Sequence, residues 1–299
     1  MNNSPASNRA DAWRERIDGL VSESIGQKRV AVVGCGSVGS FMCDELARCG
    51  VTYFTLIDPD DVEWPNLTRT VYGHADIGTS KVQALTRHLQ HIFPDIQCTT
   101  HGCEVQALGD RMSEVFRDFD LVVAAVDDPR GNGLLDRLCY SLGVPVVFVA
   151  IYKGAKGGEV IAVRPPVTPC FGCATGGARE ALSDIVDTRE IQRDRDYGTN
   201  KLIAEIALGS DIHFVCNAAV KICLSMMSEP GEALYGFMHD QIKQGVHYVM
   251  LGMEPNYYIF PSTHEQAKGQ HAFQSLWLQT TGREDCPRCG DEAYRLAVD

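Results

Sequence analysis

Three glycines and one aspartate near the start of the chain have the spacing of a nucleotide-binding turn. An apolar run ending at Val33 passes directly into Gly34, Gly36 and Gly39, the pattern GxGxxG. Such glycines permit a tight turn and let backbone amides at a helix N-terminus approach a phosphate. A second apolar run ends in Asp58, nineteen residues after Gly39 (58 − 39), where nucleotide-binding folds place a ribose-binding carboxylate. The spacing predicts a nucleotide site; the alternative is a turn that only closes a strand–helix–strand unit.

Further polar residues favour a triphosphate as the nucleotide. Asn66 and Arg69 follow Asp58 in one short segment, and Lys81 follows in the next. Fixed cations stabilise the negative charge of a reacting triphosphate, whereas hydride transfer does not need them here. Asp127 ends another apolar run, and a strand-end carboxylate beside phosphates is a ligand that Mg²⁺ prefers. Taken singly, each of these side chains would also suit a turn or a solvated surface.

Four of the twelve cysteines form two CxxC pairs, Cys170 with Cys173 and Cys286 with Cys289. Each pair lies in a predicted turn and can supply one edge of a tetrahedral Zn²⁺ site. The pairs are 113 residues apart (286 − 173), so a shared structural zinc would tie the C-terminal end to the body of the protein. Redox-active CxxC pairs are the alternative. The remaining cysteines, Cys216 among them, are more typical of small buried apolar residues.

The elements that must position these residues alternate along the chain. Apolar strands followed by amphipathic helices predict an α/β fold, with a doubly wound, mostly parallel Rossmann-like sheet and helices on both faces. We expect an N-terminal helical segment at 1–28 and a main nucleotide-binding domain at 29–232. Within the main domain, the charged stretch 174–201 is interpreted as a surface crossover loop. Residues 233–299 are expected to form a small β-rich lobe and the zinc-binding end, packed on the same domain.

Composition excludes some classes of protein. The chain has 299 residues, of which 44 % are apolar, which is ample for one large core. Its formal net charge of −12 argues against a nucleic-acid partner. No apolar run approaches a membrane span, and the N-terminus lacks the apolar core of a signal peptide. We therefore expect a cytoplasmic protein, without a membrane partner, whose cysteines are thiols.

Four motifs in order resemble the ThiF/MoeB/HesA family of ubiquitin-activating-type adenylyltransferases. They are GCGSVGS, LIDPDDVEWPNLTRTVY, DIGTSK and DLVVAAVDDPRGN. The resemblance implies ATP- and Mg²⁺-dependent adenylation of the C-terminal carboxylate of a ubiquitin-like or sulfur-carrier protein. The acyl-AMP would then pass to an external thiol, a sulfur donor or a conjugating enzyme. It implies contacts with the nucleotide from Gly34, Gly36 and Gly39, with ribose from Asp58, with triphosphate from Asn66, Arg69 and Lys81, with Mg²⁺ from Asp127, and with structural zinc from Cys170, Cys173, Cys286 and Cys289.

The chain also departs from the resembled family. Thr70 stands where relatives usually carry Gln, and no cysteine occurs between Cys173 and Cys216, where thioester-forming relatives place a catalytic cysteine. Cys216 is the remaining candidate nucleophile, but a core position suits it better, so we expect adenylation without a self-thioester. Arg16 resembles an arginine that relatives donate across a homodimer into the partner's ATP site. A peptide substrate, a non-catalytic scaffold of the same fold and an NAD-dependent oxidoreductase are the alternatives.

Overall fold

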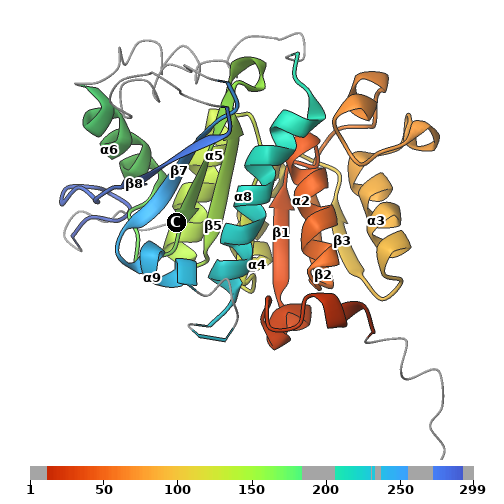
Figure 1. Cartoon of the computed structure of the whole chain (residues 1–299), viewed down its shortest axis with the longest axis horizontal. Helices are drawn as coiled ribbons and strands as arrows, with labels where there is room; N and C mark the ends of the chain where they lie inside the picture. The colour runs from red at the N-terminus through yellow and green to blue at the C-terminus, as the bar shows by residue number, and fades with distance from the viewer. Residues whose placement is uncertain (1–11, 184–205, 230, 233–236, 255–271, 292–299) are drawn as a thin grey trace, which may run out of the picture.

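An eight-stranded sheet runs through the centre of the molecule, in the order β3-β2-β1-β4-β5-β6-β7-β8 (Figure 1). The computed structural model describes residues 12–183, 206–229, 231–232, 237–254 and 272–291. The strands are β1 Arg29–Val33, β2 Tyr53–Ile57, β3 Gln97–His101, β4 Leu121–Ala124, β5 Val146–Ile151, β6 Gly157–Val163, β7 Val246–Gly252 and β8 Gln274–Gln279.

Helices connect and cover these strands. The α-helices are α2 Ser37–Arg48, α3 Lys81–Ile92, α4 Met112–Phe116, α5 Pro129–Leu142, α6 Phe171–Ser183, α8 Gly209–Met227 and α9 Phe237–Lys243. Short 3₁₀ helices are η1 Ala12–Arg16, η2 Glu23–Gln27, η3 Trp64–Thr68, η4 His74–Asp76, η5 Val105–Arg111 and η6 Lys153–Ala155. None of the described helices combines the length and apolar character that a bilayer crossing requires.

The first five strands form the parallel half of the sheet. β1 pairs in parallel with β2 and β4, β2 with β3, and β4 with β5. All four residues of β4 are buried, as are the last four of β1, which is expected when helices cover both faces of a parallel sheet. The strand order reverses direction between β1 and β4, so the predicted doubly wound arrangement is confirmed.

The last three strands extend the same sheet in antiparallel fashion. β6 pairs with β5 and β7, and β7 pairs with β8. Within the range 233–299, where a β-rich lobe is expected, the described residues thus contribute β7 and β8 to the far edge of the main sheet. Six of the seven residues of β7 are buried, and such a run needs strands beside it and cover on both faces. Residues 255–271 of the range expected to be β-rich lie outside the described residues.

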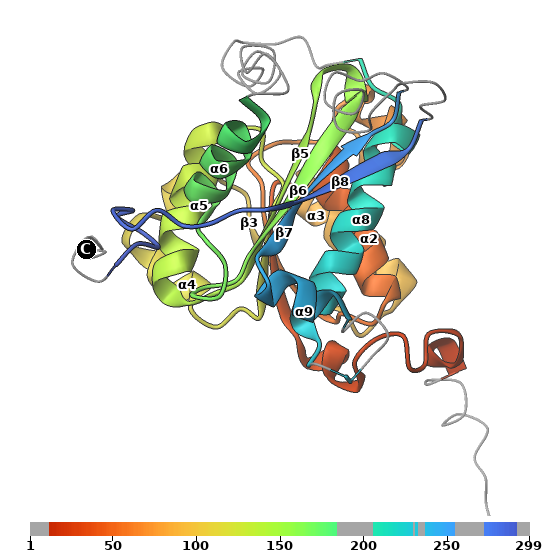
Figure 2. The same cartoon turned by 60° about the vertical axis from the view of Figure 1, so that its left-hand side comes forward.

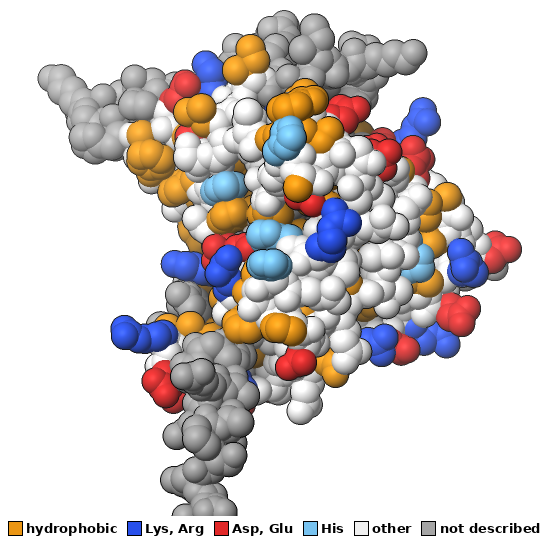
Figure 3. Space-filling view, turned by 90° about the vertical axis from the view of Figure 1, so that its right-hand side faces the viewer, with side chains coloured by type: hydrophobic (Ala, Val, Ile, Leu, Met, Phe, Trp, Pro, Cys, Tyr) orange, Lys and Arg blue, Asp and Glu red, His pale blue; other side chains and the backbone are white. Residues whose placement is uncertain are grey.

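Two apolar cores separate the sheet from its helices. Figure 2 shows α2, α3, α8 and α9 on one face and α4, α5 and α6 on the other. One core joins α2, α3 and α8 to the sheet, and the other joins α4 and α5 to the opposite face. On the face that Figure 3 displays, basic and acidic side chains alternate without a continuous basic stripe among the described residues.

The structure adds detail to two expected segments. Within 1–28, expected to be a helical segment, the described part contains two short 3₁₀ helices, η1 and η2. Gly19, between them, has a φ of 71°, a left-handed conformation that ends a right-handed helix. The stretch 174–201, expected to be a surface loop, begins as helix because α6 continues to Ser183. Its remainder lies outside the described residues.

Candidate active site

The predicted nucleotide residues converge at the carboxyl ends of three neighbouring strands. Gly34 follows β1, Asp58 follows β2, and Asp127 lies just beyond β4. These strands are adjacent in the order β2-β1-β4. Open α/β sheets bind ligands where the strand order reverses, outside the carboxyl ends of the strands. We call this switch point, between β1 and β4 and beside the glycine turn, the nucleotide crevice.

Glycine is needed at the three positions of the turn for different structural reasons. Gly34 has a φ of 92°, and a Cβ there would overlap the Ala125 carbonyl oxygen. A Cβ on Gly39 would overlap the Gly34 carbonyl oxygen. A Cβ on Gly36, in contrast, would have no atom within 4 Å, and this residue begins α2 without a side-chain cap. Gly34 and Gly39 thus allow the turn to close, while Gly36 leaves open space for a ligand at a helix N-terminus.

Asp58 is held in place beside the glycine turn. It is 5 % exposed, and its carboxylate accepts hydrogen bonds from the Cys35 N–H at 2.6 Å and the Asp60 N–H at 2.9 Å. Burial raises the pKa of Asp58, while Lys81 and these two N–H groups act in the opposite direction. A carboxylate has about four lone-pair sites. The two backbone donors orient it and leave acceptor capacity for ribose hydroxyls.

Lys81 begins α3 and is 8 % exposed. Its Nζ lies 2.7 Å from Asp60 Oδ2 and 3.9 Å from Asp58 Oδ1. The backbone around it is also tied down, because the Lys81 N–H donates to the Asp60 carbonyl oxygen at 2.9 Å and the Val62 N–H donates to that of Thr79 at 2.8 Å. Asp60 lies two residues beyond Asp58 and is itself exposed. The structure makes it the partner that orients the ammonium, a role for which the sequence held no signal beyond its proximity to Asp58.

The segment with Asn66 and Arg69 folds as a compact turn. Asn66 Oδ1 accepts a hydrogen bond from the Glu63 N–H at 2.8 Å, and the Arg69 N–H donates to the Asn66 carbonyl oxygen at 3.1 Å. Thr70 Oγ1 donates to the same oxygen at 2.8 Å. Thr70, which departs from the resembled motif, therefore closes the turn that presents the half-buried Arg69. Asn66 shapes this turn, and a contact with the nucleotide stays a prediction.

Of the two adjacent acids after β4, Asp127 is the one available to a ligand. Asp128 accepts hydrogen bonds from two backbone N–H groups of α5 and so caps this helix. Asp127 is exposed, yet burial raises its pKa, while Arg69 and Lys81 lower it. The electrostatic influence of both cations on this pKa indicates that Arg69 and Lys81 lie near the Asp127 carboxylate.

The two CxxC turns meet in space. The Sγ atoms of Cys170, Cys173, Cys286 and Cys289 all lie within 4.8 Å of one another, with 3.7 Å between those of Cys170 and Cys286. Thiolates about 2.3 Å from a tetrahedral zinc would stand ~3.8 Å apart. Burial acts to raise the pKa of Cys286, but backbone N–H groups of Cys289 and Arg288 help to lower it to about 6. This donor set fits Zn²⁺ and, with four cysteines, leaves no open coordination position, so the site would be structural.

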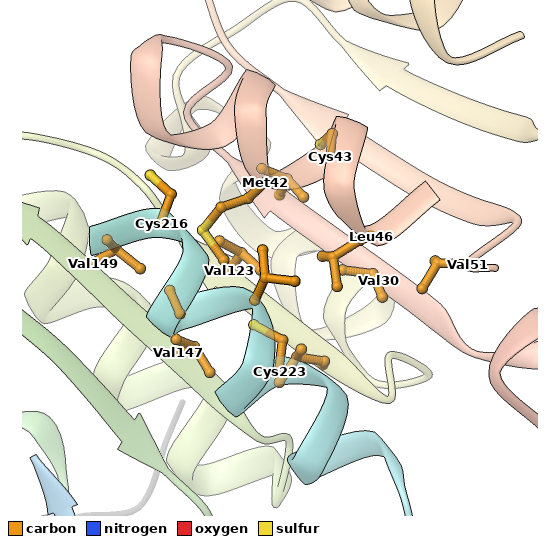
Figure 4. Packing of buried hydrophobic residues seen from close by; sticks show 14 of the residues in the cluster. Val30, Met42, Cys43, Leu46, Val51, Val123, Val147, Val149, Cys216 and Cys223 are labelled. Carbon is orange, nitrogen blue, oxygen red and sulfur yellow. The ribbon is translucent and has the colours of Figure 1, made fainter. Parts of the chain in front are cut away.

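Neither Cys216 nor Arg16 is positioned to act in the nucleotide crevice of its own chain. Cys216 is fully buried, and desolvation raises its pKa to about 12. In Figure 4 it lies on α8 among the apolar side chains that pack against α2 and the sheet. This confirms its core interpretation, because a nucleophilic thiol needs exposure and a lowered pKa. The exposed Arg16 lies in η1, and the red N-terminal segment that contains η1 lies near the amino end of β1 (Figure 1).

Comparison with known proteins agrees with this geometry. The model of the ThiF family matches residues 11–255. The chain belongs to the ThiF family. Ubiquitin-like modifier-activating enzyme 5 of Drosophila ananassae is 30 % identical over 213 residues, which cover 68 % of this chain and 52 % of that protein. The corresponding enzyme of Aedes aegypti is 33 % identical over 188 residues, which cover 59 % and 47 %. The ThiF chain thus spans about half the length of these relatives.

Solved structures of E. coli MccB share the ThiF fold seen here. MccB with ATP superposes with a TM-score of 0.61 at 16 % identity, covering 90 % of this chain and 68 % of that one. MccB with AMPCPP and MccA gives a TM-score of 0.64 at 17 % identity, covering 97 % and 75 %. At such identities the likeness establishes the fold alone. The family therefore follows from the sequence match, and the fold follows from both comparisons.

Proposed function

We propose that this ThiF-family protein adenylates the C-terminal carboxylate of a ubiquitin-like or sulfur-carrier protein with ATP. The observation that carries the proposal is the convergence of Arg69 and Lys81 on the Asp127 carboxylate, beside the open glycine turn. The curated relatives are named as activating enzymes for ubiquitin-like modifiers, which supports this substrate class. The non-catalytic scaffold leaves the two cations near the Asp127 carboxylate without a role.

The reaction needs positioning and charge stabilisation more than covalent chemistry. A substrate carboxylate oxygen attacks the α-phosphorus of ATP, the bond to the bridging oxygen breaks, and pyrophosphate leaves with the displaced electron pair. Asp58 would hold the ribose, and the α2 N-terminus at Gly36 would face the phosphates. Arg69 and Lys81 would stabilise the charge that grows on phosphorus and on the leaving pyrophosphate. The acyl-AMP retains the activation energy of ATP for the next transfer.

Asp127 would be the protein's carboxylate ligand of the magnesium ion. Mg²⁺ binds through one or two carboxylates together with substrate phosphates and water. Asp127 is the exposed carboxylate beyond β4 that remains for such a ligand, because Asp128 caps α5. When bound, the ion would supply Lewis-acid stabilisation of the phosphate oxygens. The NAD-dependent alternative leaves Arg69 and Lys81 without a role. For this reason the adenylation proposal explains more of the site.

The acyl group would leave the protein on an external acceptor. The chain carries no cysteine between Cys173 and Cys216, and Cys216 is buried with a raised pKa. An external thiol, persulfide or conjugating-enzyme cysteine would therefore attack the acyl-AMP directly. We place the reaction in the cytoplasm, where free cysteines persist, and in a homodimer. Arg16, remote from its own crevice, would then act on the partner's site.

A ligand-stabilisation experiment tests the nucleotide assignment. Mg·ATP at a hundred times its dissociation constant should stabilise the fold by about 2.7 kcal/mol, and NAD or NADH should not. Lys81→Ala and Asp127→Ala should each weaken the response. Lys156→Ala and Asp95→Ala, which change exposed charges outside the crevice, serve as matched controls. Stabilisation by NAD alone would overturn the proposal, and pyrophosphate release on addition of a carrier with a free C-terminus would establish the reaction.

A further inference from the structure

One buried carboxylate contacts both of the turns that carry the paired cysteines. Asp136, in the middle of α5, is 1 % exposed. It accepts hydrogen bonds from the Phe171 N–H at 2.8 Å and from the Gly172 N–H at 3.3 Å, both inside the first CxxC turn. Arg288, inside the second turn, donates from Nη1 to Asp136 Oδ2 and forms an ion pair with it. A side chain of α5 thus bridges segments that are more than a hundred residues apart.

The surrounding backbone is shaped to allow this bridge. A Cβ on Gly172 would lie 3.0 Å from Arg288 Nη1 and 3.9 Å from Asp136 Oδ2, so a glycine leaves the guanidinium its path to the carboxylate. In the second turn, a Cβ on Gly290 would lie 2.6 Å from the Cys286 backbone nitrogen. Glycines at these two positions therefore keep both turns narrow enough for the bridge and for four sulfur atoms to meet.

Burial of this ion pair requires a compensating benefit. An ionised carboxylate in the interior is costly unless charge and hydrogen bonds compensate it. Burial raises the pKa of Asp136, while Arg288 and the two N–H groups lower it. The carboxylate is not a member of the four-sulfur cluster. The hydrogen bonds described above all join the Asp136 carboxylate to the two cysteine turns.

We propose that Asp136 and Arg288 are positioning residues that hold the two CxxC turns at zinc-binding distance before the metal binds. A metal site pays less ordering entropy when its ligands are already fixed, and groups that orient ligands typically change metal affinity by about 10- to 100-fold. The pair therefore sets how firmly the protein retains Zn²⁺. It does so without contacting the ion, and independently of the activity proposed above.

Competition with a chromogenic zinc chelator tests this assignment on the full chain. Asp136→Asn keeps the shape of the side chain but removes its charge and one acceptor, and should weaken zinc binding about 10- to 100-fold. Arg288→Lys keeps the charge but loses the planar fork, and should give an intermediate loss. Asp285→Asn is the matched control, because this exposed acid of the same turn pairs only with the exposed Arg283 in the described contacts.

A double-mutant cycle separates positioning from general destabilisation. Asp136→Asn combined with Arg288→Gln should lose no more zinc affinity than the worse single variant, because the two residues act through one contact. Thermal unfolding in excess zinc should return each variant close to wild type. If Asp136→Asn does not fold, the zinc affinity of Arg288→Gln tests the proposal instead. Arg288 is partly exposed, so its substitution should allow the protein to fold. Wild-type zinc affinity in a folded Asp136→Asn or in Arg288→Gln would overturn the proposal.

Discussion

At the scale of single residues, the glycine turn separates requirements of the fold from requirements of the ligand. Gly39 lies where any side chain would overlap the Gly34 carbonyl oxygen, whereas Gly36 faces open space. The pattern GxGxxG presents both as equivalent glycines. Their atomic surroundings show that one permits the helix to pack on the strand and the other permits an approach to the helix N-terminus.

This difference predicts that a Gly→Ala substitution lowers stability at Gly39 but weakens ligand binding at Gly36. Gly39→Ala should lower the free energy of unfolding by about 1–3 kcal/mol, the usual cost of an overfilled contact. Gly36→Ala should leave the free energy of unfolding within about 1 kcal/mol, but should weaken Mg·ATP binding because its methyl group occupies the ligand's space. Denaturant unfolding and ATP titration measure the two effects. Equal destabilisation by both variants would contradict the distinction.

A second residue-scale prediction concerns Asp127 and pH. Burial raises its pKa in the folded protein, despite Arg69 and Lys81. Between the ordinary carboxyl pKa and the raised value, the folded state keeps a proton that the unfolded state has released, so stability falls as pH rises. Asp127→Asn should therefore be more stable than wild type at pH 7, and this advantage should vanish below the ordinary carboxyl pKa.

The same substitution should abolish most of the activity. Asn cannot supply the charge that Mg²⁺ prefers, so adenylation should fall by about 100-fold or more at every pH. In the wild type, activity should decline as pH falls through the raised pKa of Asp127. Denaturation curves and pyrophosphate release, both followed from pH 4 to pH 8, test the two halves. Asp95→Asn, an exposed acid, should change neither quantity.

At the scale of elements, the crevice depends on how α8 packs against the turn that carries Arg69. Gly209 begins α8, and a Cβ there would lie 3.2 Å from the Thr68 carbonyl oxygen and 3.4 Å from Arg69 Cα. Both contacts involve backbone, which cannot move aside as a flexible side chain can. The start of α8 therefore packs against the backbone of Thr68 and Arg69 and limits where the arginine can lie.

Enlarging this contact should displace Arg69 without removing it. Gly209→Val should push the turn outward and raise the KM for ATP, and a shift near 1 Å would reduce kcat/KM by up to about 100-fold. Gly102→Ala serves as the control, because a Cβ at Gly102 would meet nothing within 4 Å. Steady-state kinetics measure the effect. Wild-type kinetics in a folded Gly209→Val protein would show that α8 does not set the position of Arg69.

At the scale of the whole molecule, the cysteine cluster closes the chain onto itself. Cys170 and Cys173 lie at the start of α6, and Cys286 and Cys289 lie beyond β8, the edge strand of the sheet. A metal shared by both pairs would bind the folded chain but not the unfolded one, so its binding free energy adds to stability. The C-terminal end is therefore expected to depend on the metal more than the parallel half does.

Metal removal should reveal this dependence. A strong chelator should release zinc, lower the Tm, and make the C-terminal end sensitive to protease before the β1–β5 core unfolds. Cys286→Ser should reproduce the effect without chelator, and Cys139→Ser, which changes a buried cysteine outside the cluster, should not release zinc. Mass spectrometry of the early proteolytic fragments locates the first cleavage. Early cleavage within the parallel strands would contradict a staple at the C-terminal end.

The sequence by itself determined the alternation of strands and helices, the glycine turn, the acids at strand ends and the two cysteine pairs. These signals are local, because turn chemistry, capping and hydrophobic period act over a few residues. Only the tertiary structure decided that Asp128 caps α5 and leaves Asp127 exposed, that Asp60 orients Lys81, that Asp136 joins Arg288, and that the C-terminal strands extend the main sheet. Each of these depends on contacts between segments far apart in the chain, and the local patterns are compatible with many such pairings.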